Sequence, residues 1–386
     1  MMRWQTGVGV AFGLLLGAVV LSISGGGGSR RGLPPSGAIL AECEGRLSEL
    51  VIHYEPSAKA AVVPVYRDFL RALDRDVTVH VVCPSQAACD ELGAALGDVR
   101  CQLIAVVVDH PITTWSRDRW VALAPAPGDG LTTLLSPRGE AAEEIWPARA
   151  GDERVGNDLA AALPSALRSR HSELYFDGGD FLADGENVFV VSRVVPRNIQ
   201  HTTDTREELL RILASELKRR VVLLDESPDH HAGMFMVAVG QRRMLVGDPT
   251  LGRKFVAPAT NTDDDSGVAD GFMNLPGGVD FTPETQHLFD AVAAQCEAAG
   301  YQVTRLPVVL ARDGRTYLTY ANVLLDQRGV RRIVYLPFYQ GAEPLNAAAR
   351  TVWENLGFEV RPVDCTSVYR HFGCLHCLVN VLKREP

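Results

Sequence analysis

The sequence predicts an α/β fold, because amphipathic helical segments alternate with short runs of β-branched residues from about residue 38 onward. One pattern of a helix end, a tight turn and a valine-rich strand occurs four times. Its copies are RALDRDVTVHVVC ending at Cys83, SELKRRVVLLD ending at Asp225, CEAAGYQVTRLPVV ending at Val309 and ENLGFEVRPVD ending at Asp364. Their irregular spacing predicts a repeated strand–helix–strand module with insertions, in place of a solenoid of fixed period. An ordinary α/β sheet makes the same local pattern and stays the alternative.

The N-terminal segment differs from the rest of the chain. Residues 7–24 carry no charge and have no polar face, and a Gly/Pro-rich stretch follows them. Their length is at the lower limit for a membrane-spanning helix and slightly long for a signal-peptide core. We therefore expect a signal peptide or membrane anchor over 1–24, a linker over 25–37 and a single domain over 38–386. The protein is then exported (periplasmic, extracellular or membrane-anchored), and only residues 7–24 contact a membrane.

Three helices of the main domain have recognisable ends. A capping box of Thr205 and Glu208 begins the first helix, since their side chains can satisfy each other's exposed backbone N–H groups. Thr282 followed by Pro283 begins the second helix, and Gly300 ends it by tolerating a left-handed conformation. Gly357 ends the third helix. The long polar connections at 126–156 and 255–280 are expected to be surface loops, and the Asp263–Asp265 run is expected to be solvated and not a calcium site.

Composition excludes some classes of protein. A net charge of −9 provides no basic footprint for nucleic acid, so no nucleic-acid partner is predicted. The eight cysteines are too sparse for a disulfide scaffold, and their pairing cannot be deduced from sequence.

Four short segments place reactive side chains at expected boundaries between strands and loops. They are TTWSRDRW with Asp118, FDGGDFL with Asp177 and Asp180, DHHAGMFMVAVG with His230 and His231, and GCLHCLVNVL with Cys377. Singly, each has an ordinary structural explanation as an ion pair, a turn or an exposed loop. Cys377, however, opens an expected C-terminal helix, where the helix dipole and free N–H groups stabilise a thiolate. A free thiolate, a histidine and several carboxylates together provide a nucleophile, an acid/base and anchors for a cation.

In this order and at comparable separations, the four segments resemble the guanidino-group-modifying superfamily, and most of all its agmatine deiminases and bacterial peptidylarginine deiminases. The shared features are a W-x-R-D segment, an acid-Gly-Gly-Asp segment and a His-Cys pair near the C-terminus. YLTYANVLLD (317–326) and residues 335–364 also resemble later modules of that family, so the similarity extends over 45–384. The resemblance implies a five-module, pentein-like α/β propeller. It also implies hydrolysis of a guanidinium group to a ureido product and ammonia, with no metal or organic cofactor.

Carried over position by position, the resemblance makes Cys377 the nucleophile that forms a covalent thiouronium. His231 protonates the departing ammonia and then activates water, and Asp177 supports both the histidine and the substrate cation. The implied substrate-binding residues are Trp115, Asp118, Asp180 and Asn322. The implied substrate is an arginine peptide or protein, or agmatine, and export favours the peptide by analogy.

The sequence departs from the family at Gly233, where the family normally has an aspartate two residues after the histidine. Losing such a contact to a buried cation typically costs about 2–5 kcal/mol. Three interpretations stay open. Asp229 or Asp180 replaces the missing carboxylate, or the substrate is less cationic or differently held, or the chain is a non-catalytic descendant that binds a ligand or partner on the same fold.

Cys374-Leu375-His376-Cys377, with His371 nearby, also allows a redox or zinc site. No second ligand pair with zinc-finger spacing occurs in the sequence, and the rest of the chain lacks a thioredoxin-like order. The residues therefore favour a nucleophile at Cys377 over this alternative.

Overall fold

The structure is a computed structural model that describes residues 37–139, 147–256 and 272–386. The expected signal or anchor segment at 1–24, nearly all of the linker at 25–37 and the Asp263–Asp265 run lie outside these ranges. Among the helices that are described, none combines the length and the apolar character needed to cross a bilayer. The boundary of a single domain at 38–386 stays a prediction.

The described strands form six small sheets, and five of these share one topology. In each of the five, two antiparallel strands are followed by a helical crossover to a third strand that is parallel to the second. This arrangement is a strand–helix–strand module preceded by one extra strand. The predicted α/β fold and its repeated module are therefore confirmed, and the alternative of one ordinary sheet is wrong.

We call these five sheets, with their helices, units one to five. Unit one contains β19 (Val379–Glu385), β1 (Arg46–His53), β2 (Thr78–Cys83) and β3 (Gln102–Val107). Unit two contains β4 (Val121–Leu123), β5 (Thr132–Ser136) and β6 (Leu167–His171). Unit three contains β7 (Phe181–Ala183), β8 (Asn187–Val190) and β9 (Arg220–Leu223). Unit four contains β10 (Met236–Gly240), β11 (Arg243–Asp248) and β13 (Gln302–Pro307). Unit five contains β16 (Leu324–Arg328), β17 (Arg331–Phe338) and β18 (Glu359–Asp364). The sixth, smaller sheet contains β12 (Val279–Asp280), β14 (Val309–Ala311) and β15 (Tyr317–Leu318).

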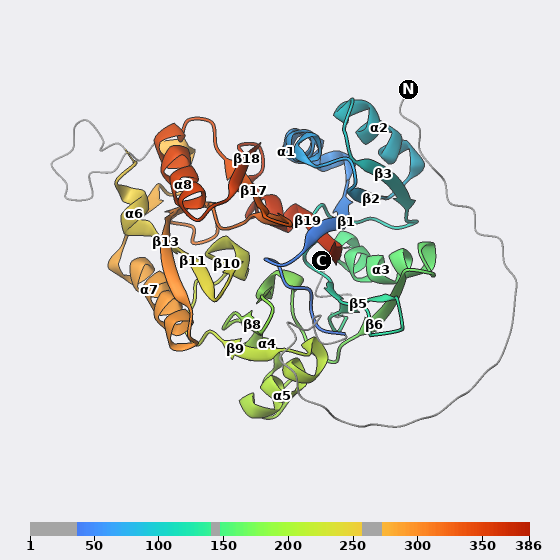
Figure 1. Cartoon of the computed structure of the whole chain (residues 1–386), viewed down its shortest axis with the longest axis horizontal. Coiled ribbons are helices and arrows are strands. Elements are labelled where there is room, and N and C mark those ends of the chain that lie inside the picture. The colour runs from blue at the N-terminus through green and yellow to red at the C-terminus, as the bar shows by residue number, and fades with distance from the viewer. Residues whose placement is uncertain (1–36, 140–146, 257–271) are drawn as a thin grey trace, which may run out of the picture.

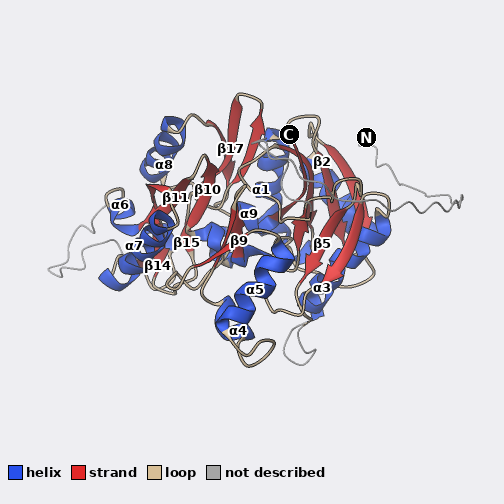
Figure 2. Cartoon of the chain, turned by 60° about the horizontal axis from the view of Figure 1, so that its bottom comes forward, coloured by secondary structure: helices blue, strands red, loops and turns tan. Residues whose placement is uncertain are grey.

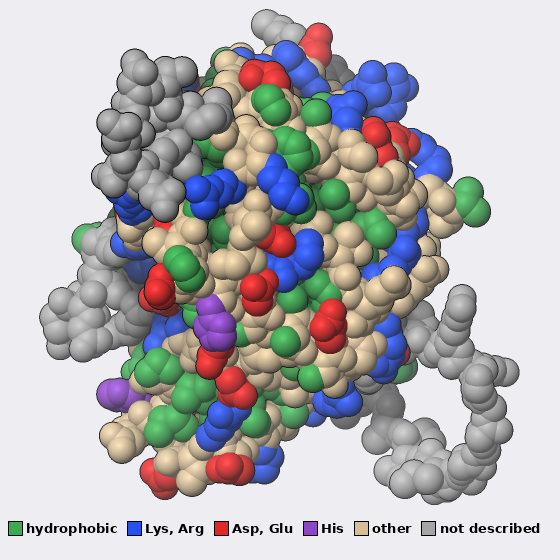
Figure 3. Space-filling model, turned by 90° about the vertical axis from the view of Figure 1, so that its left-hand side faces the viewer, with side chains coloured by type: hydrophobic (Ala, Val, Ile, Leu, Met, Phe, Trp, Pro, Cys, Tyr) green, Lys and Arg blue, Asp and Glu red, His purple; other side chains and the backbone are tan. Residues whose placement is uncertain are grey.

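The helices lie mainly outside the strands, and the units follow one another around a common centre (Figures 1 and 2). The described helices are α1 (Lys59–Ala72), α2 (Gln86–Leu96), α3 (Pro147–Ala162), α4 (Val194–Asn198), α5 (Arg206–Leu217), α6 (Pro249–Arg253), α7 (Pro283–Ala298), α8 (Glu343–Asn355) and α9 (Leu375–Leu378). On the face near α6, α7 and α8, basic, acidic and apolar side chains are interspersed (Figure 3). That face therefore has no extended patch of one charge sign.

The predicted helix ends are confirmed, but only half of the capping box forms, because the Glu208 side chain accepts from the Asp204 backbone N–H and not from that of Thr205. The Thr205 side chain accepts a 3.1 Å hydrogen bond from the backbone N–H of Glu208 at the start of α5. Thr282 caps α7. Gly300 and Gly357 follow α7 and α8 with φ of +90° and +83°, a backbone conformation that favours glycine.

Two sequence-based expectations about secondary structure are wrong. The stretch 126–156 is not a plain surface loop, because it contains β5 and the first part of α3, which begins at Pro147. The chain does not end in a helix either, because α9 is a single four-residue turn and β19 follows it. The apolar residues after Cys377 form a strand because they pair with the free edge of β1.

The pairing of β19 with β1 joins the two ends of the described chain. The last strand thus supplies the first strand of unit one, and α9 comes to lie near the centre of the molecule (Figure 2). A contiguous cluster of buried apolar side chains extends from Ile39 to Val381. The residues just before β19 are consequently held by the core of the whole fold.

Candidate active site

Five polar side chains lie a few residues before the first strand of the five units. Asp118 precedes β4, Asp177 precedes β7, His231 precedes β10, Asn322 precedes β16 and Cys377 precedes β19. The units share one topology around a common centre, so their equivalent loops converge there. A rigid scaffold that presents loops in this way is a common arrangement for binding and catalytic residues.

These loops enclose a cleft of about 360 Å³, which the side chains of Trp115, Asp118, Asp177, His231 and Cys377 line. Two other predicted site residues lie elsewhere. Asp180 is fully buried and does not line the cleft; its carboxylate accepts a 2.8 Å hydrogen bond from the backbone N–H of Asp177. Asn322 does not line this cleft and instead lies beside Cys377 in a smaller cavity.

Cys377 is held by its neighbours with its thiol free. Its Sγ lies 3.5 Å from the Asn322 side-chain nitrogen, and the Asn322 oxygen accepts a 2.8 Å hydrogen bond from the backbone N–H of His376, which fixes the amide orientation. None of the eight cysteines, all of which are described, forms a disulfide. The expected stabilisation by a helix N-terminus is wrong, because α9 is one turn and the Cys377 N–H already bonds to the Cys374 carbonyl at 3.1 Å.

His231 lies between Asp177 and Cys377, and its surroundings favour the protonated imidazole. Its Nε2 is 3.9 Å from an Asp177 carboxylate oxygen. Burial alone would lower its pKa, but interactions with the neighbouring Asp177 and Cys377 side chains and the nearby Asp118 charge raise the pKa of His231 to about 10. The ring packs against Gly179, where an added Cβ would lie 2.4 Å from the imidazole Cγ. The paired glycines of the DGGD segment therefore make room for the histidine.

His230 has a different role from its neighbour. Burial, together with the positive His231, holds the pKa of His230 well below its usual range, so its ring is neutral. Its Nδ1 accepts a 2.8 Å hydrogen bond from the backbone N–H of His231. Of the two histidines, only His231 is placed to exchange protons with a group at Cys377.

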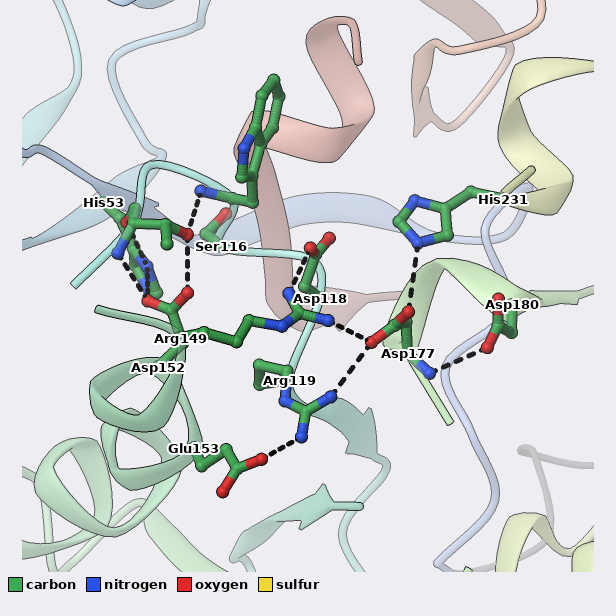
Figure 4. Close-up of polar contacts among 12 residues, drawn as sticks. His53, Ser116, Asp118, Arg119, Arg149, Asp152, Glu153, Asp177, Asp180 and His231 are labelled. Carbon is green, nitrogen blue, oxygen red and sulfur yellow. Dashed lines mark hydrogen bonds and ion pairs between the residues drawn. The ribbon is translucent and has the colours of Figure 1, made fainter. Parts of the chain in front are cut away.

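A guanidinium group of the chain itself bridges the two cleft carboxylates. One nitrogen of Arg149 donates to Asp118 at 2.6 Å, and another donates to Asp177 at 2.5 Å (Figure 4). Burial raises the pKa of Asp118, although His231 and Arg149 partly oppose this effect. The pKa of Asp177 lies well below its usual range, because His231 and the surrounding arginines outweigh its burial.

Arginines also surround Asp177 on its other sides. Arg119 donates to it at 3.1 Å, Arg197 at 3.2 Å and Arg193 at 3.3 Å. Arg193 also donates to Asp180 at 2.6 Å. The carboxylates of the DGGD segment are thus neutralised by the chain.

Arg149 could not be identified from the sequence. It lies in the first turn of α3, inside the stretch that was expected to be a loop. Pro147 at the first helical position is a local signal for the start of this helix. No local pattern indicates which side chain of that helix reaches the cleft.

A smaller cavity lies at Gly233, where the resembling family has aspartate. Glu42, Arg117, His376 and Cys377 also line it. An added Cβ at Gly233 would lie 3.2 Å from the Asn322 side-chain nitrogen and 3.5 Å from His376 Nδ1, so a small side chain fits only if Asn322 shifts slightly. Asp229 and Asp180, the carboxylates considered as replacements, do not line this cavity, whereas Glu42 does. Burial raises the pKa of Glu42, although Arg117 partly opposes this effect.

The Cys-Leu-His-Cys segment does not form a metal-ligand cluster. Within the described ranges, the one group of His, Cys, Asp and Glu side chains whose donor atoms converge is Asp177, Asp180 and His231. Arg193 and Arg197 bond both of these carboxylates, which opposes binding of a further cation there. The Cys374 thiol instead lies 3.3 Å from the Tyr339 hydroxyl.

The sequence matches no protein-family model and no curated protein sequence. Solved structures, in contrast, share its architecture. The agmatine deiminase of C. jejuni is 15% identical with a TM-score of 0.62, and the alignment covers 89% of this chain and 95% of that one. The agmatine deiminase of Enterococcus faecalis is 15% identical with a TM-score of 0.64, over 90% of this chain and 95% of that one.

These likenesses show that the chain has an α/β fold shared with solved deiminase structures. More particularly, it is the pentein-like α/β fold of the agmatine deiminases.

Proposed function

We propose that this protein is a hydrolase that converts a guanidinium group to a ureido group and ammonia. One observation carries the proposal. The cleft that presents Cys377 and His231 holds a guanidinium, that of Arg149, between Asp118 and Asp177. Paired carboxylates that accept two N–H groups of one guanidinium fix the plane and position of such a group.

In the proposed reaction, the Cys377 thiolate attacks the central carbon of the substrate guanidinium and forms a tetrahedral adduct. His231, which carries a proton near neutral pH, donates it to the departing nitrogen, and ammonia leaves a covalent thiouronium. Water then attacks this carbon while neutral His231 takes its proton. The C–S bond then breaks, the hydroxyl proton of the adduct passes to solvent or to the released ammonia, and the thiolate and the neutral ureido product are left. Every bond in this sequence is made or broken by groups of the protein, the substrate and one water.

The substrate that we propose is an arginine peptide or protein, or a related small guanidine such as agmatine. The comparisons support guanidine chemistry in general, since agmatine deiminases share the fold. We also propose that the five units form the five-module propeller of that fold. We further propose that residues 1–24 are a signal peptide or membrane anchor and that the protein is exported.

A second candidate function is ligand binding without catalysis. Gly233 lacks the carboxylate of the resembling family, and Arg149 occupies the carboxylates that would hold a substrate. A protein of this kind would keep the fold and the cleft but release no ammonia.

A colorimetric ureido assay separates the two functions. The full chain is incubated with an arginine peptide, free arginine and agmatine, alongside Cys377→Ala and a matched variant, Cys296→Ala, whose buried thiol lies in α7. We expect product with the wild type and Cys296→Ala and none with Cys377→Ala. Equal, zero product from all three proteins on every guanidine would refute the hydrolase.

A further inference from the structure

We propose that Arg149 is a specificity-determining residue: its guanidinium occupies the seat of the substrate guanidinium, so that a substrate must displace it. The inference rests on the proposed function, because it takes Asp118 and Asp177 as that seat. It adds that a side chain of the protein itself competes with the substrate for these two carboxylates.

The contacts of Arg149 have the form expected of a bound substrate. Two of its nitrogens reach two different carboxylates, at 2.6 Å to Asp118 and 2.5 Å to Asp177. The side chain is 13% exposed and lines the same cleft as Cys377. A planar guanidinium donates to two acceptors in this way because its N–H groups form a rigid fork.

The neighbouring arginines do not share this placement. Arg119 also bonds Asp177, but its side chain is only 1% exposed, it pairs with Glu153 (Figure 4), and neither residue lines the cleft. Arg193 and Arg197 bind Asp177 together with Asp180, away from Asp118. Arg149 is therefore the described arginine that bridges the two cleft carboxylates.

Helix α3 holds Arg149 in this position through its close contact with the site loops. Asp152, three residues further along the same helix face, accepts hydrogen bonds from the backbone N–H and side-chain hydroxyl of Thr113 at 2.8 and 2.5 Å. A Cβ added at Gly151 would lie 1.7 Å from the Pro111 carbonyl oxygen, so the helix backbone directly touches this loop. With the helix fixed, Arg149 leaves the seat by rotation of its own side chain.

A tethered guanidinium competes at a high effective concentration, on the order of millimolar or more. A bare small guanidine offers the carboxylates the same hydrogen bonds as Arg149 and no others, so it competes poorly. A larger substrate can gain contacts at the cleft mouth, where exposed Arg315 and Asp229 contribute to the lining. Arg315 stacks over the Phe372 ring at 4.4 Å. The cleft therefore selects guanidines that carry a second polar or charged group.

Calorimetric titration with methylguanidine, which has no second group, tests the inference in the full chain. Arg149→Ala should bind this probe about tenfold more tightly than the wild type, or better, because the tethered competitor is gone. The matched control is Arg154→Ala, which removes an exposed arginine of the same helix that pairs with Asp109 outside the cleft. This control should bind methylguanidine as the wild type does.

Equal affinity of the wild type, Arg149→Ala and Arg154→Ala for methylguanidine would overturn the inference. Arg149→Gln, which keeps a hydrogen-bond donor but not the charge or the fork, serves the same comparison if the alanine variant does not fold. Tighter binding by the Arg149 variant without any ureido product leaves the occupied seat intact and refutes the proposed reaction. Ureido product from the wild type, together with equal methylguanidine affinity of the wild type and the Arg149 variant, supports the proposed reaction and refutes the competition by Arg149.

Discussion

Replacing Asp177 by asparagine removes one charge from the centre of the site with little change in shape. In the native protein this carboxylate faces His231 at 3.9 Å and accepts hydrogen bonds from Arg149 and other arginines. Its interaction with His231 stabilises the protonated imidazole and contributes to a pKa of about 10. In Asp177→Asn the imidazolium loses this partner, so the pKa of His231 should fall.

The size of this fall follows from the strength of the interaction. Asp177 and His231 form an ion pair at 3.9 Å, and an opposite charge within about 4–6 Å typically shifts a pKa by about 1–3 pH units. The pKa of His231 should therefore decrease by about one to two pH units in this variant. His231 must be protonated to release ammonia, so the alkaline limb of the activity profile should move down by the same amount. The free energy of unfolding should also decrease at alkaline pH. A group whose pKa is raised in the folded state stabilises the fold below its unfolded pKa, and for His231 this contribution is lost as pH rises through about 10.

Two measurements check this shift. NMR titration of the His231 ring gives the pKa without requiring turnover, and the pH dependence of ureido formation gives the position of the alkaline limb. Asp229→Asn is the matched control, because it removes an exposed carboxylate that also lines the cleft. A pKa of His231 that stays near 10 in Asp177→Asn, or that falls equally in both variants, would refute this prediction.

Two glycine substitutions test the space around the site. Gly179→Ala should lower the free energy of unfolding by about 2 kcal/mol or more and abolish activity, because its Cβ would lie 2.4 Å from the His231 ring. An unchanged melting temperature and an unchanged rate would contradict this packing. Gly233→Asp should fold at a cost of about 1–3 kcal/mol, because its Cβ would lie 3.2 Å from the Asn322 nitrogen, which must shift slightly. It should also raise kcat/KM for cationic guanidines by about tenfold, since a further carboxylate would hold the guanidinium; a decrease for these substrates would show that the carboxylate is not the missing group.

Local sequence signals predicted the repeated part of the fold well. Thr205, Thr282, Gly300 and Gly357 mark helix ends by their own backbone chemistry, so neighbouring residues suffice to predict them. The C-terminal strand was missed for the opposite reason. The residues after Cys377 form a strand because β1, which lies at the other end of the described chain, offers them a free edge.

The residues of the candidate site likewise include some that local sequence signals predict and some that they do not. Cys377, His231, Asp177 and Asp118 lie in short segments whose resemblance to a known family could be recognised without a structure. Their convergence follows from the repeated topology, which places each segment before the first strand of a unit. Arg149 and Glu42 carry no such local signal, because each reaches the site only through the packing of distant segments.

The two departures from the resembling family act in the same direction. Without a carboxylate at Gly233, Asp118 and Asp177 are the acidic groups of the described cleft that lie deep enough to hold a guanidinium beside Cys377. Arg149 already donates to both. Each of these two differences alone would weaken the binding of a small cation. Together they mean that such a cation finds no third carboxylate and must displace Arg149 from the two that are present. If the protein is a hydrolase, its substrate must compensate with contacts at the cleft mouth, so that substrate selection depends more on the groups attached to the guanidine than on the guanidine itself.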